Sequence, residues 1–259
     1  MNTRRGFRMS EPGLRRTAGA NSSRKVLQLL LSFTEQRWEA SVAELAEAIG
    51  SPVATTYRYV QLLKELQLLE ESRSGRYHVT SRVMPLARAA RLANDLARVA
   101  RPVMEEAVRE LGETVLLFQH FGDVAVCSDR VECDRPMRFT FQPGHSIPLG
   151  VGATGRMLLA LLPDGARERQ VARISRERGA EVRDDLKLAL ANRYAQSWGE
   201  IEDGVWCCSV PVDVDRHRPS VLTFVGPATR IGDAERERAL TALRAYAEQI
   251  GKAVSEYSV

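Results

Sequence analysis

The sequence lacks a long apolar segment. No run of 18 or more uncharged apolar residues occurs in its 259 residues, so it predicts no membrane-spanning helix. Cysteine is scarce: the four residues Cys127, Cys133, Cys207 and Cys208 include no C-x-x-C pair, so no zinc site is predicted. With no secretory segment evident, four cysteines in a chain of this length predict reduced thiols and a cytoplasmic protein.

The motifs of common enzymes are also missing. The sequence holds no phosphate-binding loop, no G-x-S-x-G elbow and no paired-histidine metal motif, so no cofactor, metal or catalytic residue is predicted. Glu200 and Glu202 flank a turn, but adjacency alone does not make a general acid–base pair. A thiol-dependent enzyme using Cys207 stays an alternative, although the sequence assigns it no activating base or cation. The favoured prediction is a protein that is not an enzyme.

Positive charge is concentrated at the front of the chain. Residues 1–100 carry 16 Lys and Arg against 9 Asp and Glu, a net of +7, whereas residues 101–259 have a net of −3. Residues 1–21 are rich in Arg and Gly and predict a disordered basic arm. This distribution indicates a polyanion-binding module joined to a second domain of another kind.

The order of elements after the arm predicts a helix-turn-helix. A helix begins near Ser22, and Ser41 with Glu44 forms a capping-box pattern before a short helix that ends at Gly50. A further helix is expected from about Pro52 to Leu66, with two short strands and a hairpin turn after it, at 68–71 and 76–79. Such a pair of helices places its second member in the DNA major groove. A three-helix bundle with a hairpin and no DNA-binding role is the alternative.

Residues 82–111 predict a long helical region with Pro102 inside it. Pro102 is expected to break or kink this region, which sets the boundary between a linker helix and a second domain near Val99–Pro102. The second domain alternates strands and helices. Strands are expected at 114–119, 124–131, 138–141, 205–214 and 220–225, a loop at 143–149, and helical structure at 153–162, 164–198 and 234–256.

The Gly-rich segment from Gly150 to Gly155 leads into one of these helices. The first N–H groups of a helix and the positive end of its dipole can hold an anion. A tight loop that uses Gly only for backbone room is an equal alternative.

With these motifs the chain resembles the IclR family of bacterial transcriptional regulators over about residues 22–256. The residues that carry the resemblance are 22–30, 41–50, Pro52, Thr55, Tyr57 and Arg58, then 143–149, 152–160, 200–207, Pro211, Gly226, Pro227 and Ile231. The chain departs from the family at Gln67, which stands where Gly is usual, and at Ser197, where Asp is frequent.

The resemblance implies an α+β protein with an N-terminal winged helix-turn-helix, a linker helix and a C-terminal GAF-like antiparallel sheet domain flanked by helices. The expected divisions are an arm at 1–21, a DNA-binding domain at 22–80, a linker helix at 81–100 and an effector-binding domain at 101–259. The implied function is sequence-specific binding to double-stranded operator DNA, modulated by a small organic effector such as an aromatic or carboxylic acid. A homodimer or a dimer of dimers is implied as well. A C-terminal domain that serves only oligomerisation is the alternative.

Two sets of site residues follow. The expected DNA-binding residues are Arg24, Thr55, Thr56, Tyr57, Arg58, Arg73 and Arg76. The effector-binding residues implied by the family's motifs are Phe139, Ile147, Ala153, Thr154, Ser197, Cys207, Thr223 and Val225. Thr223 and Val225 are two apart on one predicted strand, so their side chains are expected on the same face.

Overall fold

The computed structural model describes residues 17–257 except 36, 140, 179–180 and 215–217. The chain divides into two compact units, 1–90 and 91–259. Most of the predicted arm at 1–21, including Arg4, Arg5, Arg8, Arg15 and Arg16, lies outside the described residues. Within the described part of the chain, no helix is both long and apolar enough to cross a membrane.

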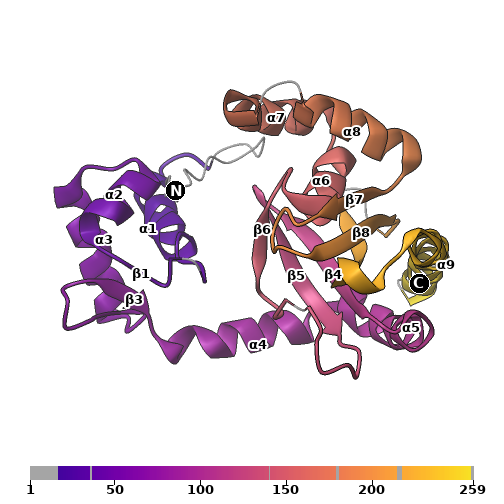
Figure 1. Cartoon of the computed structure of the whole chain (residues 1–259). Helices are drawn as coiled ribbons and strands as arrows, with labels where there is room; N and C mark the ends of the chain where they lie inside the picture. The colour runs from indigo at the N-terminus through magenta and orange to yellow at the C-terminus, as the bar shows by residue number, and fades with distance from the viewer. Residues whose placement is uncertain (1–16, 36, 140, 179–180, 215–217, 258–259) are drawn as a thin grey trace. The chain divides into compact units, whose positions relative to one another are not determined.

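The N-terminal unit is a winged helix (Figure 1). Its elements in chain order are α1 (Asn21–Leu31), β1 (Glu39–Ala40), α2 (Val42–Ile49), α3 (Val53–Glu65), β2 (Leu69–Glu71) and β3 (Tyr77–Val79). The three strands pair in the order β1-β3-β2, all antiparallel. A core of apolar side chains joins the helices to this sheet, and its most buried members include Leu29, Leu45, Val60 and Leu63.

The turn between α2 and α3 follows from local sequence signals. The predicted capping box is confirmed, since the Ser41 side chain accepts from the Glu44 N–H and the Glu44 carboxylate accepts from the Ser41 N–H. Gly50 ends α2 with φ of 58°, in the left-handed region that Gly adopts at little cost. Gln67 has φ of 57°, so the position where the family usually has Gly is left-handed in this chain too.

Two helices and a 3₁₀ turn follow the wing. The turn η1 (Ser81–Val83) leads into α4 (Met84–Leu92), and α5 spans Asp95–Leu111 after the N-cap Asn94. The break in the predicted helical region therefore falls at residues 93–94, and the expectation that Pro102 breaks it was wrong. Pro102 lies inside α5 on its exposed side, where a carbonyl that loses its helical partner can bind water.

The C-terminal unit is built on one antiparallel sheet. Its strands are β4 (Thr114–Phe121), β5 (Val124–Val131), β6 (Ser146–Pro148), β7 (Ala195–Trp198), β8 (Val205–Val212) and β9 (Ser220–Pro227). They pair in the order β6-β5-β4-β9-β8-β7, which places β4 and β9 at the centre. The helices are α6 (Gly152–Leu161), α7 (Asp164–Arg178), α8 (Glu181–Asn192) and α9 (Asp233–Tyr257), with the 3₁₀ turn η2 (Ala228–Arg230) before α9.

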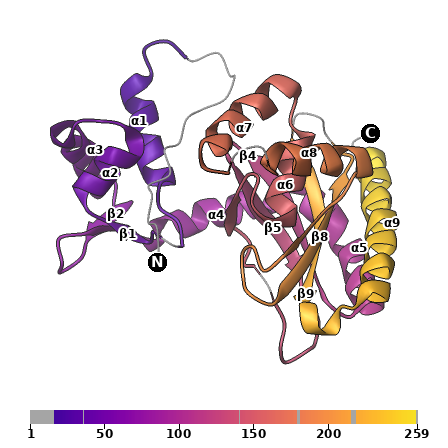
Figure 2. The ribbon, with the colours of Figure 1, turned by 45° about the horizontal axis from the view of Figure 1, so that its top comes forward.

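The helices cover both faces of this sheet (Figure 2). One face packs against α5 and α9 in a core that includes Met104, Trp206, Phe224 and Leu243. The other packs against α6, with α7 and α8 outside it, around side chains such as Phe118 and Leu158. The order of strands and helices confirms the predicted α+β class.

Three details of the second domain differ from the sequence-based prediction. No strand forms in the described part of 138–141; β5 instead pairs at its free edge with β6, which lies in the predicted loop. Pro148 is tolerated there because an edge strand needs fewer backbone donors. β7 occupies the end of a region predicted to be helical, because its pairing with β8 overrides local preference.

Candidate functional site

The start of α3 presents an exposed face. Tyr57 is 50% exposed, Arg58 is exposed with no ion pair among the described residues, and Thr55 is half-buried on the same side. Thr56 differs from these three, because it is fully buried and its hydroxyl donates to the carbonyl of Pro52 at 3.0 Å. The structure therefore corrects the expectation that Thr56 contacts DNA; its side chain holds the first turn of α3 together.

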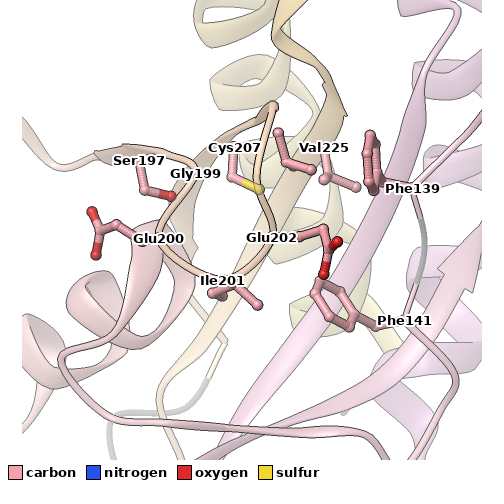
Figure 3. Close-up of a pocket in the computed structure, with 10 residues that line it drawn as sticks. Phe139, Phe141, Ser197, Gly199, Glu200, Ile201, Glu202, Cys207 and Val225 are labelled. Atoms are coloured by element: carbon pink, nitrogen blue, oxygen red, sulfur yellow. The ribbon is translucent and has the colours of Figure 1, made fainter. Parts of the chain in front are cut away.

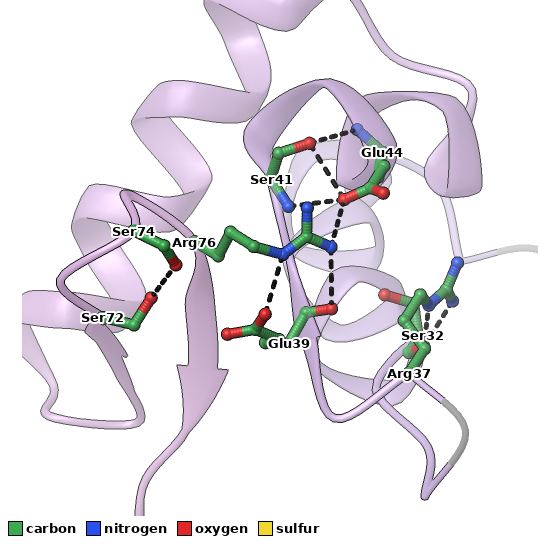
Figure 4. A network of polar contacts seen from close by, with 8 residues as sticks. All are labelled: Ser32, Arg37, Glu39, Ser41, Glu44, Ser72, Ser74 and Arg76. Atoms are coloured by element: carbon green, nitrogen blue, oxygen red, sulfur yellow. Dashed lines mark hydrogen bonds and ion pairs between the residues drawn. The ribbon is translucent and has the colours of Figure 1, made fainter.

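The two predicted arginines of the wing have different surroundings. Arg73 lies exposed at the tip of the β2–β3 hairpin, and its guanidinium forms no ion pair with a carboxylate of the described residues. Arg76 is tied down: its guanidinium pairs with Glu39 at 3.1 Å and with Glu44 at 2.8 Å (Figure 4). These contacts hold the wing against the start of α2, so the Arg76 guanidinium is engaged in ion pairs within the N-terminal unit.

The carboxylate of Glu44 thus serves both the capping box and the wing. Its pKa is lowered, first by the hydrogen bond from the Ser41 backbone N–H and further by Arg76. Arg24 lies on the first turn of α1 with its guanidinium directed to the carbonyl of Thr17 at 3.5 Å. Of the seven expected DNA-binding residues, the face of α3 brings together Thr55, Tyr57 and Arg58.

A cavity of about 170 Å³ lies in the C-terminal unit, on the α6 side of the sheet (Figure 3). It is lined by Phe139, Phe141, Ser197, Gly199, Glu200, Ile201, Glu202, Val205, Cys207 and Val225. The two phenylalanines come from the segment between β5 and β6, and residues 199–202 form the turn between β7 and β8. Strands β7, β8 and β9 supply the others.

The cavity contains four of the eight predicted effector residues: Phe139, Ser197, Cys207 and Val225. The other four do not line it. Ile147 and Ala153 are buried in the core, with 3% and 1% exposure. Thr154 and Thr223 are buried as well, and their hydroxyls bond to each other and to Ser209 at 2.8 to 3.1 Å. The predicted contact of Thr154 and Thr223 with a ligand is corrected by this closed cluster.

The start of α6 does not offer the free donors expected of it. The N–H of Gly152 donates to the carboxylate of Glu200 at 3.1 Å, and the N–H of Ala153 donates to the Ser197 hydroxyl at 3.0 Å. The positive end of the helix dipole is therefore already matched by a protein carboxylate. Two of the first N–H groups of α6 are therefore not free for a ligand anion in this structure.

Arg156 holds Glu200 in that position. Its guanidinium lies 2.7 Å from the Glu200 carboxylate and 3.1 Å from that of Asp185, and it donates to the carbonyl of Gln196 at 2.9 Å. Only 11% of the Arg156 side chain is exposed. The Arg156 side chain is thus a buried cation that joins α6 to α8 and β7.

The sequence does not indicate that the turn between β7 and β8 lines the cavity. Its pattern gives the carboxylates of Glu200 and Glu202 no role and predicts Phe141 in a strand. No local pattern shows that these residues share a cavity, because the walls come from segments about 60 residues apart in the chain. The family resemblance implied only those wall residues that lie in the family's motifs or beside them.

The cysteine at the cavity is a poor nucleophile. Burial, with a smaller contribution from the Glu200 carboxylate, raises the pKa of the Cys207 thiol to about 12. A thiol with this pKa stays protonated at neutral pH, and the thiolate is the reactive form. As expected for neighbours on a strand, Cys208 points to the opposite face of the sheet and lies in the other core. No group of His, Cys, Asp and Glu in the described residues could hold a metal ion.

The chain combines a winged helix, a fold common in DNA-binding regulators, with a sheet domain that holds a small cavity. Residues 22–73 match the family model described as the IclR helix-turn-helix domain, and residues 89–252 match that of the bacterial transcriptional regulator IclR C-terminal domain. The chain belongs to the IclR family of transcriptional regulators.

Curated relatives agree with this assignment. The chain is similar to the probable transcriptional regulator SauR of Cupriavidus necator, with 35% identity over 51% of this chain and 53% of that protein. The match therefore spans about half of the length of SauR. It is also similar to the HTH-type transcriptional regulator KipR of Bacillus subtilis, with 26% identity over 71% of this chain and 76% of that protein.

Solved structures show the same fold. An IclR family transcriptional regulator from Brucella abortus superposes with a TM-score of 0.81 at 24% identity, covering 90% of this chain and 92% of that chain. An IclR homologue from Microbacterium hydrocarbonoxydans, solved in complex with 4-hydroxybenzoate, has a TM-score of 0.64 at 21% identity. That match covers 91% of this chain and all of the other.

Proposed function

We propose that the protein binds operator DNA through the exposed face of α3 and changes its DNA affinity when a small organic molecule occupies the cavity of the C-terminal unit. The observation that carries this proposal is the combination of the two features in one chain of the IclR family. The two features can be tested separately.

The DNA contact rests on Thr55, Tyr57 and Arg58. Hydroxyl groups bind phosphates, and a guanidinium binds either phosphate or guanine, so the three exposed or half-buried side chains suit the major groove. Arg73 at the tip of the wing is placed to reach a flanking phosphate. Double-stranded operator DNA is therefore the proposed macromolecular partner.

The effector site rests on the cavity rather than on the start of α6. Phe139, Val205 and Val225 supply apolar wall, while Ser197 and Cys207 supply polar groups, a mixture typical of small-molecule sites. The complex of one structural neighbour with 4-hydroxybenzoate supports a small aromatic molecule as the kind of effector. The cavity favours this function over a C-terminal unit that serves only oligomerisation, and the raised pKa of Cys207 opposes a thiol-dependent enzyme.

Oligomerisation is the third part of the proposal. Among the described residues of α4 none is buried, and Met84, Leu86 and Leu92 are 64–77% exposed. Apolar side chains with this much exposure in a single protomer support a contact with a second copy of the chain, as a homodimer or a dimer of dimers. A ligand that favours one dimer geometry over another then changes DNA affinity.

The proposal is tested on the full chain with operator DNA selected from a random pool. The expected result is sequence-specific binding that changes by about 5- to 150-fold when an effector from a compound library is added. The variant Cys207→Phe fills the cavity and is expected to bind DNA without responding to the effector. Leu188→Phe adds the same ring at an exposed position of α8 and is expected to respond normally. An unchanged response of Cys207→Phe would place the effector elsewhere.

A further inference from the structure

The charges around the cavity suggest which effectors it accepts. None of the described residues that line it is Lys, Arg or His, whereas Glu200 and Glu202 are both part of its wall. Resting on the proposed function of this cavity, we propose that it binds a small apolar molecule with a cationic amino group and discriminates against carboxylates.

The position for an anion at the start of α6 is already filled by a protein carboxylate. The carboxylate of Glu200 accepts a hydrogen bond from the N–H of Gly152 and pairs with the guanidinium of Arg156. Arg156 is further held by Asp185. These donors are therefore not free for a ligand carboxylate, which the negative charge of Glu200 would also repel. Binding an anion there would require the buried network to be broken.

Glu202 is the second carboxylate of the cavity wall. It is exposed at the rim of the cavity and has no ion pair within the described residues. Figure 3 shows its carboxylate directed toward the ring of Phe141. An unpaired carboxylate at the mouth of an apolar cavity attracts a cation and repels an anion, and the effect is stronger than in bulk water because the local dielectric is lower.

Two aromatic rings form part of the same wall. Phe139 and Phe141 line the cavity beside Glu202. The Phe141 ring is held in place by Phe118, edge to face at a centroid distance of 6.1 Å, and by stacking on His145 at 4.5 Å. Aromatic faces attract an ammonium group through their quadrupole. A carboxylate next to two aromatic rings is thus a favourable environment for a protonated amine.

The volume and lining of the cavity limit the rest of the ligand to a small apolar group. Val205, Cys207 and Val225 form its inner wall, with no charged atom. A cavity of about 150 Å³ is known to hold benzene, so the 170 Å³ found here fits one ring with a short substituent. The ring would lie against the strands, and the amino group would lie at the rim near Glu202.

The experiment compares three probes of nearly equal shape and different charge: benzylamine, benzyl alcohol and benzoate. Their binding to the full-length protein is measured by titration calorimetry at pH 7 and low salt. We expect benzylamine to bind most tightly and benzoate most weakly. In Glu202→Gln, we expect the affinity for benzylamine to fall by about 3- to 10-fold, the scale of one charge–charge contact near the surface. Added salt should reduce the preference in the unmodified protein.

Glu237→Gln is the matched control, since Glu237 is an exposed carboxylate on α9 that does not line the cavity. The preference of this variant for benzylamine over benzoate should equal that of the unmodified protein. Tightest binding of benzoate, or equal binding of all three probes, would overturn the charge preference and leave the effector site itself in place. If no probe binds and the Cys207→Phe variant still responds to an effector found by screening, both the cavity and the inference fail.

Discussion

The hydroxyl of Thr154 on α6 lies 3.0 Å from that of Thr223 on β9, 69 residues later in the chain. Ser209 on β8 completes the triangle, at 3.1 Å from Thr154 and 2.8 Å from Thr223. The three side chains are at most 3% exposed. They satisfy one another, so this polar cluster joins the helix to the two strands in the interior of the unit.

Removing all three members of this cluster together should cost less than the sum of the three single removals. Thr223→Val leaves Thr154 and Ser209 each without one buried partner, and should lower the free energy of unfolding by about 1–3 kcal/mol. The triple variant Thr154→Val, Ser209→Ala, Thr223→Val should lose much less than three times that amount, because no hydroxyl is left unpaired. Denaturant unfolding of the variants measures both. Strictly additive losses would show that the hydroxyls act independently.

Adjacent threonines on α3 should have separate effects. Thr55→Ala should weaken operator binding with little change in stability, since Thr55 lies on the exposed side of the helix. Thr56→Ala removes the buried hydrogen bond to Pro52 and should lower the free energy of unfolding by about 0.5–1.5 kcal/mol. Its operator affinity, measured by fluorescence anisotropy under conditions where it is folded, should stay close to that of the unmodified protein. A reversed pattern would contradict the placement of α3.

The arginines of the wing should differ in their salt dependence. Arg73→Ala removes an exposed cation at the hairpin tip and should reduce the slope of log K against log salt by about 0.9, the value for one phosphate contact. Arg76→Ala instead breaks the pairs with Glu39 and Glu44 and should lower the unfolding midpoint of the wing. Binding titrations at four salt concentrations separate the two effects. An unchanged slope for Arg73→Ala would show that the wing tip does not reach the DNA.

Acid should weaken the attachment of the wing. The pKa of Glu44 is lowered in the folded protein, so its contribution to stability is present above its ordinary value of 4.5 and is lost as the pH falls through the lowered folded value. The variant Glu44→Gln should therefore show a smaller fall in unfolding free energy below pH 4.5 than the unmodified chain. Parallel curves for the two proteins would exclude this role of Glu44.

The open face of α4 should mediate association. Light scattering at micromolar concentration should give a mass of at least two chains. Replacing Leu86 and Leu92 by Glu should shift the protein toward the monomer, because charge opposes burial of these exposed apolar positions. Leu188→Glu changes an equally exposed leucine on α8 and should leave the mass unaltered. A monomer in the unmodified protein would contradict the proposed dimer.

Local signals in the sequence determined the N-terminal unit closely. The capping box at Ser41, the left-handed Gly50 and the hairpin turn before Arg76 each act within a few residues, so their effect is the same in any surroundings. The strands of the second domain with alternating or continuous apolar residues were predicted for the same reason. The helix break was misplaced because a proline on the exposed side of a helix does not have to end it.

Only the tertiary structure decided the chemistry of the cavity. Glu200 is separated from Gly152 by 48 residues, and its role as the anion at the start of α6 depends on how β7 and β8 meet that helix. Likewise, the family's motifs implied that Thr154 and Thr223 face a ligand, whereas the fold gives their buried hydroxyls hydrogen-bond partners within the protein. Which polar groups stay free for a ligand depends on contacts between distant segments, and no local pattern in the sequence contains them.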